Sequence, residues 1–155
     1  MRDSRVADDL RRAAVELFAE QGYATTSVQQ IVDTAGVTNG AMYHYFASKD
    51  DLLFGIYDSL LTLQKAHLDE IVARGGDVDE ILRAACIDVV KTSIDQLREG
   101  AVFFQSQHLL TPERGREVVR RRREYHDVFA ALLERGQREG RYRTDVPLAV
   151  LVAHF

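Results

Sequence analysis

Apolar residues along this chain recur mostly at the three- and four-residue spacing of helices, and few stretches alternate as strands do. Near the amino terminus one apolar stripe ends at Gly22, and a second lies between a capping serine, Ser27, and a helix-ending glycine, Gly36. The pattern therefore predicts two helices here, with apolar positions Leu10, Ala13, Ala14, Leu17 and Phe18 in the first and Val28, Ile31, Val32 and Ala35 in the second.

A third short helix is predicted directly after this glycine, with Thr38 as its cap. Met42 and Phe46 are four residues apart and face inward, whereas Tyr43 and His44 point outward. Two short helices joined by a tight glycine turn form a helix-turn-helix, in which the start of the second helix enters the major groove of DNA. The sequence thus predicts a DNA-reading element.

The rest of the pattern predicts longer helices and therefore an all-α protein. Ser48 and Asp51 form a possible capping box at the start of the first of them. A break is predicted at Glu99-Gly100, and Thr111-Pro112 is a strong restart signal. Because the sequence stops while its last helix is still apolar, we expect the carboxy-terminal helices to be incomplete. The predicted helices cover residues 48–74, 77–98, 101–110, 111–137 and 148–155.

Composition fits an ordinary globular protein that buries a core. The chain has 155 residues, of which 46% are hydrophobic and 28% are charged. Its one cysteine, Cys86, excludes an internal disulfide and fits a cytoplasmic location. No apolar run approaches the roughly 18 residues that a membrane span needs. We therefore expect a cytoplasmic protein that does not contact a membrane.

Charge and motifs narrow the functional classes further. The net charge of −4 argues against a nonspecific nucleic-acid coat, but it leaves room for a few directed contacts. The sequence contains no His-Glu-x-x-His, P-loop, Gly-x-Ser-x-Gly or metal-spaced cluster. We therefore expect a protein that is not an enzyme and that needs neither a cofactor nor a metal.

The side chains around the third helix have the chemistry that DNA recognition uses. An asparagine such as Asn39 bonds adenine in a bidentate manner, which is worth about 1–3 kcal/mol of discrimination. Taken singly, each of these side chains is also consistent with packing or an ordinary surface, and only their ordered run favours DNA. Predicted base and phosphate contacts are Thr25, Thr26, Thr38, Asn39, Gly40, Ala41, Tyr43, His44 and Lys49.

This region also resembles a known family. Residues 35–53 have the sequence Ala-Gly-Val-Thr-Asn-Gly-Ala-Met-Tyr-His-Tyr-Phe-Ala-Ser-Lys-Asp-Asp-Leu-Leu. It is similar to the tetracycline-repressor (TetR) family signature, small-Gly-Val-Ser/Thr-x-Gly-x-Leu/Met-Tyr-x-x-Phe-x-x-Lys-x-x-Leu. The upstream segment, residues 13–28, resembles the first helix of that family and its Gly-Tyr-x-x-Thr-(Thr/Ser) link.

The resemblance implies a homodimeric regulator that responds to a small-molecule effector. Residues 1–47 are then a helix-turn-helix DNA-binding domain, and residues 48–155 are an effector-binding and dimerisation domain. A dimer of this kind places two recognition helices in successive major grooves of a near-palindromic operator. The most favoured function is a repressor that its effector releases from DNA. The alternative is a ligand-independent DNA-binding organiser of the same fold that acts through protein partners.

In the TetR family the effector lies among the middle helices. The candidate lining residues here combine apolar walls with a few polar groups, as small-molecule sites do. Plain core packing is an equally good interpretation of the aromatic residues among them. The candidates are Tyr57, Leu61, Cys86, Val90, Phe103, Phe104, Gln107, His108, Tyr125 and Phe129.

A run of arginines marks the later half of the chain, at Arg114, Arg116 and positions 120–123. A solvated helix face with acidic partners three or four residues away is the favoured interpretation. The sharper one is that an arginine holds the carboxylate or phosphate of an acidic ligand, because guanidinium suits bidentate recognition. The later half also resembles regulators that answer to acyl- or steroid-derived coenzyme A thioesters.

Overall fold

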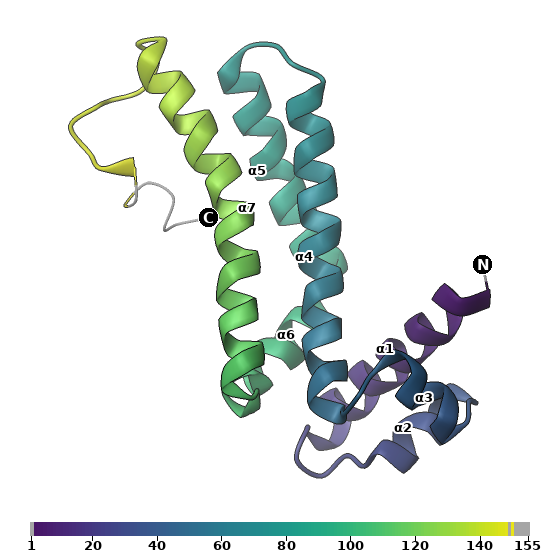
Figure 1. Ribbon diagram of the computed structural model, residues 1–155. Helices are drawn as coiled ribbons and strands as arrows, with labels where there is room; N and C mark the ends of the chain where they lie inside the picture. Colours follow the sequence, from purple (N-terminus) through teal and green to yellow (C-terminus); the bar gives the residue numbers. More distant parts are fainter. Residues whose placement is uncertain (1, 149, 151–155) are drawn as a thin grey trace. The chain divides into compact units, whose positions relative to one another are not determined.

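The protein is described by a computed structural model that covers residues 2–148 and 150 (Figure 1). These residues form helices and no strand, which confirms the all-α prediction. Within the same residues, no helix is both long enough and apolar enough to cross a membrane. The helices are α1 (Arg2–Gln21), α2 (Val28–Ala35), α3 (Asn39–Tyr45), α4 (Lys49–Ala73), α5 (Val78–Asp95), α6 (Leu97–Ser106), the 3-10 helix η1 (Gln107–Leu109) and α7 (Pro112–Arg138).

The chain divides into two compact units. The first unit contains the residues up to Leu60 together with Gln96–Val118, and the second contains Leu61–Asp95 together with the chain from Val119 onward. Helices α4 and α7 each supply residues to both units. The domain boundary predicted between residues 47 and 48 stays a prediction.

The core of the first unit forms around α1, which packs against α2, α3 and α6. Each of these helices turns its apolar stripe inward, as the helical spacing predicts, and burial of that stripe is what stabilises helices this short. The buried side chains include Leu10, Ala14, Phe18, Ile31, Met42 and Phe103. The recognition helix α3 is thereby fixed to a packed scaffold.

Local capping sets the ends of α2 and α3. Ser27 and Gln30 form a reciprocal capping box at the start of α2. Gly36 ends that helix with φ 66° and ψ 32°, a left-handed conformation that glycine adopts without a Cβ penalty. Thr38 Oγ1 then accepts the backbone N–H of Ala41 at 3.1 Å and begins α3. These details confirm the predicted caps and the predicted turn.

The second unit is built on α4, α5 and α7, which run side by side in Figure 1. Its buried cluster takes Leu68 from α4, Ala85 from α5, and Tyr125 and Phe129 from α7. Ion pairs close one end of this bundle. Arg141 contacts carboxylates at both ends of the Asp77–Asp79 segment, at 2.5 and 3.0 Å.

Two sequence predictions about helix ends need comment. The break predicted at Glu99-Gly100 is wrong, because α5 ends at Asp95 and α6 begins at Leu97. Gln96, with φ −110° and ψ 26°, makes the break, and Gly100 lies inside α6. Glycine alone was therefore a misleading signal here. The predicted last helix, residues 148–155, lies mostly outside the described residues.

Phe46 joins the end of α3 to α4 through a close approach at a glycine. The Phe46 side chain is buried, and a Cβ added at Gly55 would lie 2.8 Å from Phe46 Cε1. No real Cβ tolerates that distance, so Gly55 is required for the ring to pack directly on the α4 backbone. Helix propensity alone would favour alanine at this position.

Replacing Gly55 tests this packing. We expect Gly55→Ala to lower the free energy of unfolding by about 1–2 kcal/mol, because overpacking costs more than the gain in helix propensity returns. Gly100→Ala is the matched control, since among the described residues nothing lies within 4 Å of a Cβ placed there. It should stabilise the protein by up to about 1 kcal/mol. Urea unfolding measures both, and equal effects of the two substitutions would contradict the packing.

Candidate nucleic-acid interface

Helix α3 has one buried face and one exposed face. Met42 is completely buried, whereas Asn39 and Gly40 at the start of the helix are exposed. The Tyr43 side chain is 56% exposed, and that of His44 is exposed as well. The structure thus brings the predicted base contacts and two of the predicted phosphate contacts onto one accessible surface.

A chain of side-chain hydrogen bonds connects this surface to α2. Asn39 Nδ2 donates to Gln29 Oε1 at 2.9 Å, and Gln29 Nε2 donates to Asp33 Oδ1 at 2.8 Å. Sequence reasoning missed Gln29 and Asp33 as members of the site. Their spacing of four residues on one helix is a signal for mutual contact, but their link to Asn39 depends on how α2 and α3 pack.

Lys49 holds the turn between α1 and α2. Its Nζ donates to the backbone carbonyls of Tyr23 and Thr26, each at 2.8 Å, and lies 4.3 Å from the centroid of the Tyr23 ring. Burial lowers the pKa of Lys49, and burial followed by the charge of Asp50 raises the pKa of Tyr23. Two of the three N–H donors of the ammonium are therefore used inside the protein.

The two threonines after α1 differ in accessibility. Thr25 is exposed, and its Oγ1 donates to backbone carbonyls at the end of α1. Thr26 is 1% exposed and donates to the Gly22 carbonyl at 2.8 Å, while Gln21 Nε2 donates to its hydroxyl at 3.1 Å. The Thr26 hydroxyl therefore completes the end of α1 and is turned away from the solvent.

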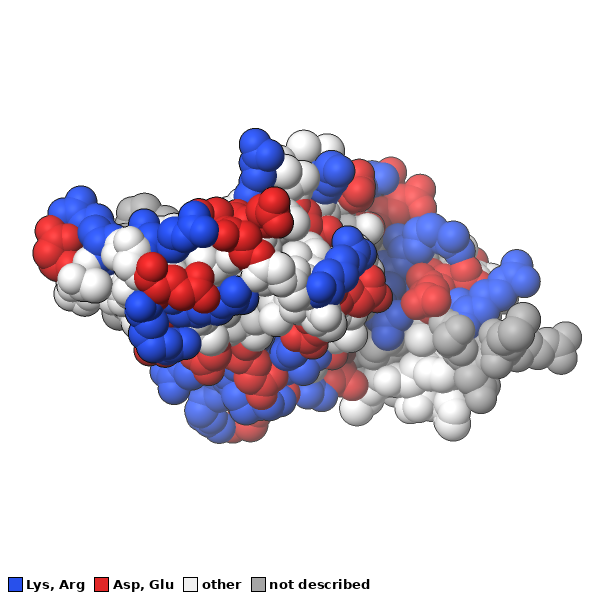
Figure 2. Space-filling view, turned by 90° about the horizontal axis from the view of Figure 1, so that it is seen from above, with Lys and Arg blue, Asp and Glu red and all other residues white. Residues whose placement is uncertain are grey.

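The surface charge is mixed. In α1, Arg11 and Arg12 pair with Asp8 and Asp9, one turn earlier in the helix. Figure 2 shows Lys and Arg side chains interleaved with Asp and Glu over the face that it displays. The net charge of −4 also argues against binding DNA through a broad positive field, so we expect affinity to depend on a few directed contacts.

Some of the predicted effector residues form an aromatic cluster in the first unit. Tyr57 and Phe103 stack with ring centroids 3.7 Å apart, and both are buried. Phe104 meets Tyr57 edge-on at 6.2 Å and is 53% exposed. On the same stretch of chain, Gln107 is half-buried and His108 is exposed.

Other predicted effector residues belong to the second unit. Tyr125 and Phe129 are buried with ring centroids 5.4 Å apart, whereas Val90 is exposed and Cys86 is half-buried. Burial, followed by the charges of Asp88 and Cys86, raises the pKa of Tyr125 to about 12. Leu61, the remaining predicted residue, is buried. The effector contacts stay a prediction.

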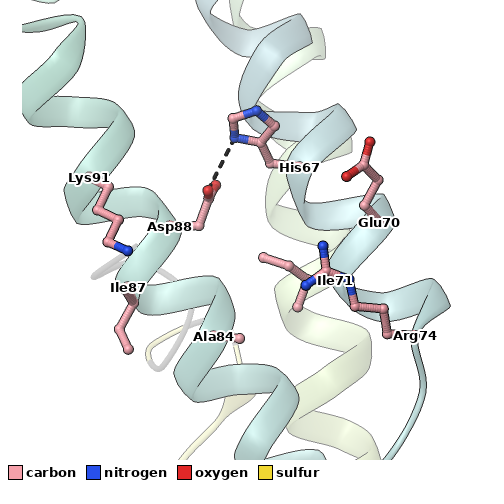
Figure 3. A pocket seen from close by; sticks show the side chains of 8 residues that line it. All are labelled: His67, Glu70, Ile71, Arg74, Ala84, Ile87, Asp88 and Lys91. Carbon is pink, nitrogen blue, oxygen red and sulfur yellow. Dashed lines mark hydrogen bonds and ion pairs between the residues drawn. The ribbon is translucent and has the colours of Figure 1, made fainter.

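A groove of about 380 Å³ lies between α4 and α5 in the second unit (Figure 3). It carries both signs of charge, and His67 Nδ1 lies 3.1 Å from Asp88 Oδ1 across it. None of the predicted effector residues lines this groove. Its lining residues are His67, Glu70, Ile71, Arg74, Ala84, Ile87, Asp88 and Lys91.

The arginines of α7 mostly have acidic partners, as the favoured interpretation predicts. Arg116 pairs with Glu113, and Arg120 pairs with Glu124. Arg114 is different, because it reaches α4 and pairs with Asp51. That contact joins segments far apart in the sequence, and no spacing rule reveals it.

Comparison with known families agrees with this geometry. The family model described as "Bacterial regulatory proteins, tetR family" matches residues 10–56, and "Tetracyclin repressor-like, C-terminal domain" matches residues 75–154. The chain belongs to the TetR family. It is therefore a DNA-binding transcription regulator, and the TetR resemblance in the sequence is confirmed.

Several TetR-family proteins are similar over most of this chain. The HTH-type transcriptional repressor KstR2 of Rhodococcus jostii (strain RHA1) is 32% identical over 144 residues, which cover 89% of this chain and 68% of that protein. The TetR family regulator PfmR from Thermus thermophilus aligns with a TM-score of 0.82 and 26% identity, over 94% of this chain and 79% of that one. The ketosteroid transcriptional regulator KstR2 of Mycobacterium tuberculosis aligns with a TM-score of 0.75 and 25% identity, over 96% and 76%.

Lys49 offers a direct test of what holds together the DNA-binding head, which consists of helices α1 to α3. We expect Lys49→Met to lower the free energy of unfolding by about 1–3 kcal/mol, because two backbone carbonyls lose a charged donor. Lys65→Met is the matched control on the same helix, where Lys65 makes an exposed pair with Asp69 that is worth about 0.5 kcal/mol or less. Chemical denaturation compares them, and an unchanged stability of Lys49→Met would show that the contacts to Tyr23 and Thr26 contribute nothing.

Proposed function

We propose that this protein is a homodimeric repressor that binds a near-palindromic operator and leaves it when a small-molecule effector binds. The observation that carries the proposal is the exposed start of α3, which is fixed from behind by the buried Met42 and Phe46. Two such helices in a dimer would read half-sites about 34–36 Å apart. Membership of a regulator family supports this use of the surface.

The proposed DNA contacts follow from accessibility. Base edges would meet the start of α3, and phosphates would meet the exposed hydroxyl, phenol and imidazole groups around it. The third N–H of Lys49 would reach a phosphate, and Thr26 is not among the contacts because its side chain is buried. The contacts that we propose are Thr25, Thr38, Asn39, Gly40, Ala41, Tyr43, His44 and Lys49.

Coupling between effector and DNA has a physical route inside the first unit. Helix α6 packs against α1, which is part of the DNA-binding head. The same α6 carries Phe103, whose ring stacks on Tyr57 of α4. A ligand that displaces this stack would therefore move elements on which the recognition helix rests. The ligand can shift this equilibrium only as far as it binds the displaced arrangement more tightly than the stacked one.

A polar link at the start of α4 adds a second route. The backbone N–H and the hydroxyl of Thr111 donate to the Asp50 carboxylate at 3.3 and 3.2 Å. Arg114 pairs with Asp51 and lies 4.6 Å from the centroid of the Phe54 ring. The first turn of α7 is therefore joined to the first turn of α4. We propose that this joint transmits the response to the effector.

The class of effector that we propose is an acyl-coenzyme A thioester or another acidic lipophilic compound. The aromatic cluster around Phe104 offers an apolar surface, and Arg114, at the start of α7 in the same unit, offers a guanidinium for an anionic group. Among the structural neighbours, one is named a ketosteroid transcriptional regulator, which supports a lipophilic ligand.

Base readout is tested with Asn39. A randomised duplex library that is selected by the wild-type chain defines the operator, and Asn39→Ala should then lose preference at one base pair per half-site. The loss should be roughly 5- to 150-fold, as expected for one bidentate contact. Lys49→Met should instead weaken binding to all sequences and lower the slope of log affinity against log salt by about one. Unchanged selection by both variants would contradict the contact assignment.

The effector response is tested on that selected duplex with palmitoyl-CoA and with free coenzyme A. Palmitoyl-CoA should release the protein in a mobility-shift assay, and free coenzyme A should not. Arg114→Gln should retain DNA binding but lose most of the release, for which a coupling of about 1–3 kcal/mol is typical. Arg116→Gln, which affects only an exposed pair with Glu113, is the control.

Failure of every acyl-CoA thioester and carboxylated steroid to bind in calorimetry would overturn the proposed effector class. A protein that keeps its operator with every such compound would instead act as a DNA-binding organiser through protein partners.

A further inference from the structure

The hydrogen-bond chain from Asp33 through Gln29 to Asn39 has a fixed direction. An ionised carboxylate only accepts hydrogen bonds, so the Gln29 amide must turn its nitrogen toward Asp33. The Gln29 carbonyl oxygen then faces Asn39, which must respond with its own amide nitrogen. Amide groups are otherwise ambiguous between their two orientations, and here the chemistry of Asp33 removes the ambiguity.

The direction of this chain decides what Asn39 shows to the solvent. One N–H of Nδ2 is bonded to Gln29, which leaves the second N–H and the Oδ1 atom. Among the contacts of the described residues, Oδ1 has no protein partner. The accessible edge of Asn39 is therefore one donor beside one acceptor. A reversed amide, with Oδ1 accepting the bond from Gln29, would present the same acceptor and donor in the opposite order.

These two presentations match different bases. Adenine shows an acceptor, N7, beside a donor, N6–H, in the major groove, whereas guanine shows two acceptors, N7 and O6. With its N–H toward N7 and its Oδ1 toward the group at position 6, the Asn39 amide makes two hydrogen bonds to adenine but sets Oδ1 against O6 of guanine. In the opposite order Oδ1 faces N7, both bonds to adenine are lost, and one bond to O6 of guanine remains. The orientation of a single amide thus changes which purine is favoured.

We propose that Asp33 and Gln29 are specificity-determining positioning residues, which orient the Asn39 amide so that α3 prefers adenine over guanine. The proposal rests on the proposed function, because it requires α3 to enter the major groove. Neither Asp33 nor Gln29 needs to touch DNA. Both act through Asn39, and the energetic signature of that dependence is non-additivity with a change at Asn39.

The test uses the full chain and a randomised duplex library, followed by affinity measurements on the selected operator and on its adenine-to-guanine variant. Gln29→Met removes the hydrogen-bonded relay from Asp33 through Gln29 to Asn39, and it does so with a side chain of similar length and good helix propensity. Asp33→Asn keeps the shape of the side chain but lets the hydrogen bonds of the relay run in either direction. One bidentate contact supplies a preference of roughly 5- to 150-fold. Each substitution should reduce that preference for adenine by a factor of at least about three.

Asp33→Asn also removes a negative charge, which raises affinity for every DNA sequence. Glu20→Gln in α1 is the matched control, since it makes the same change of charge on an exposed residue outside the relay. It should leave the adenine preference intact. In an Asn39→Ala background, Gln29→Met and Asp33→Asn should have no further effect on the preference.

The outcomes separate this inference from the function on which it rests. If the wild-type chain enriches no duplex, the proposed function fails and the relay fails with it. If Asn39→Ala relaxes the preference but Gln29→Met and Asp33→Asn do not, the relay is overturned while the function stands. An equal loss of preference in Glu20→Gln would also overturn the relay, because charge alone would then explain the effect.

Discussion

Burial of one face of α3 fixes the recognition helix to the core of the first unit. A helix of seven residues is too short to be stable in water by itself. Met42 is completely buried beneath it, Phe46 packs directly on the backbone of α4 at Gly55, and Thr38 caps its first turn. These contacts leave Asn39, Gly40, Tyr43 and His44 exposed on the other face. A surface that is rigid and unoccupied is suited to specific recognition, because little conformational entropy is lost on binding.

The contacts that fix α3 also connect it to α6 and to the first turn of α7. Helix α4 begins at Lys49, whose ammonium holds the turn before α2, and its next two carboxylates hold the first turn of α7. Helix α6 packs against α1, and its Phe103 ring stacks on Tyr57 of α4. Within the described residues of the first unit, the DNA-binding helices therefore share their core with α4 and α6. Within the first unit, packed and hydrogen-bonded contacts therefore lead from α6 and the first turn of α7 to the DNA-binding helices, and the proposed response to an effector would use them. The net charge of −4 makes this geometry important, because it argues against a broad positive field that would hold DNA without it.

The sequence predicted what local chemistry determines. The apolar stripes, the caps Ser27 and Thr38 and the left-handed Gly36 all lie within a few residues of the groups that they satisfy. It failed at Gln96, where an ordinary residue breaks the helix and the nearby glycine does not. It also could not show Lys49 on the carbonyls of a turn more than twenty residues earlier, or Arg114 on α4, because packing alone creates those contacts. In the relay, Gln29 and Asp33 are four residues apart on one helix, and that spacing is a sequence signal. The contact between Gln29 and Asn39 depends on how α2 and α3 pack and has no such signal.

We propose that this protein meets DNA through the exposed face of α3, and the other contact assignments follow from that claim. Amide hydrogen exchange of the full chain, with and without a duplex selected from random sequence, tests that claim directly. DNA is expected to slow exchange across the segment from the end of α1 to the start of α4, residues 21–49, and to leave the second unit nearly unchanged. Protection confined to α5 or to the later part of α7, with α3 exchanging as fast as before, would contradict it.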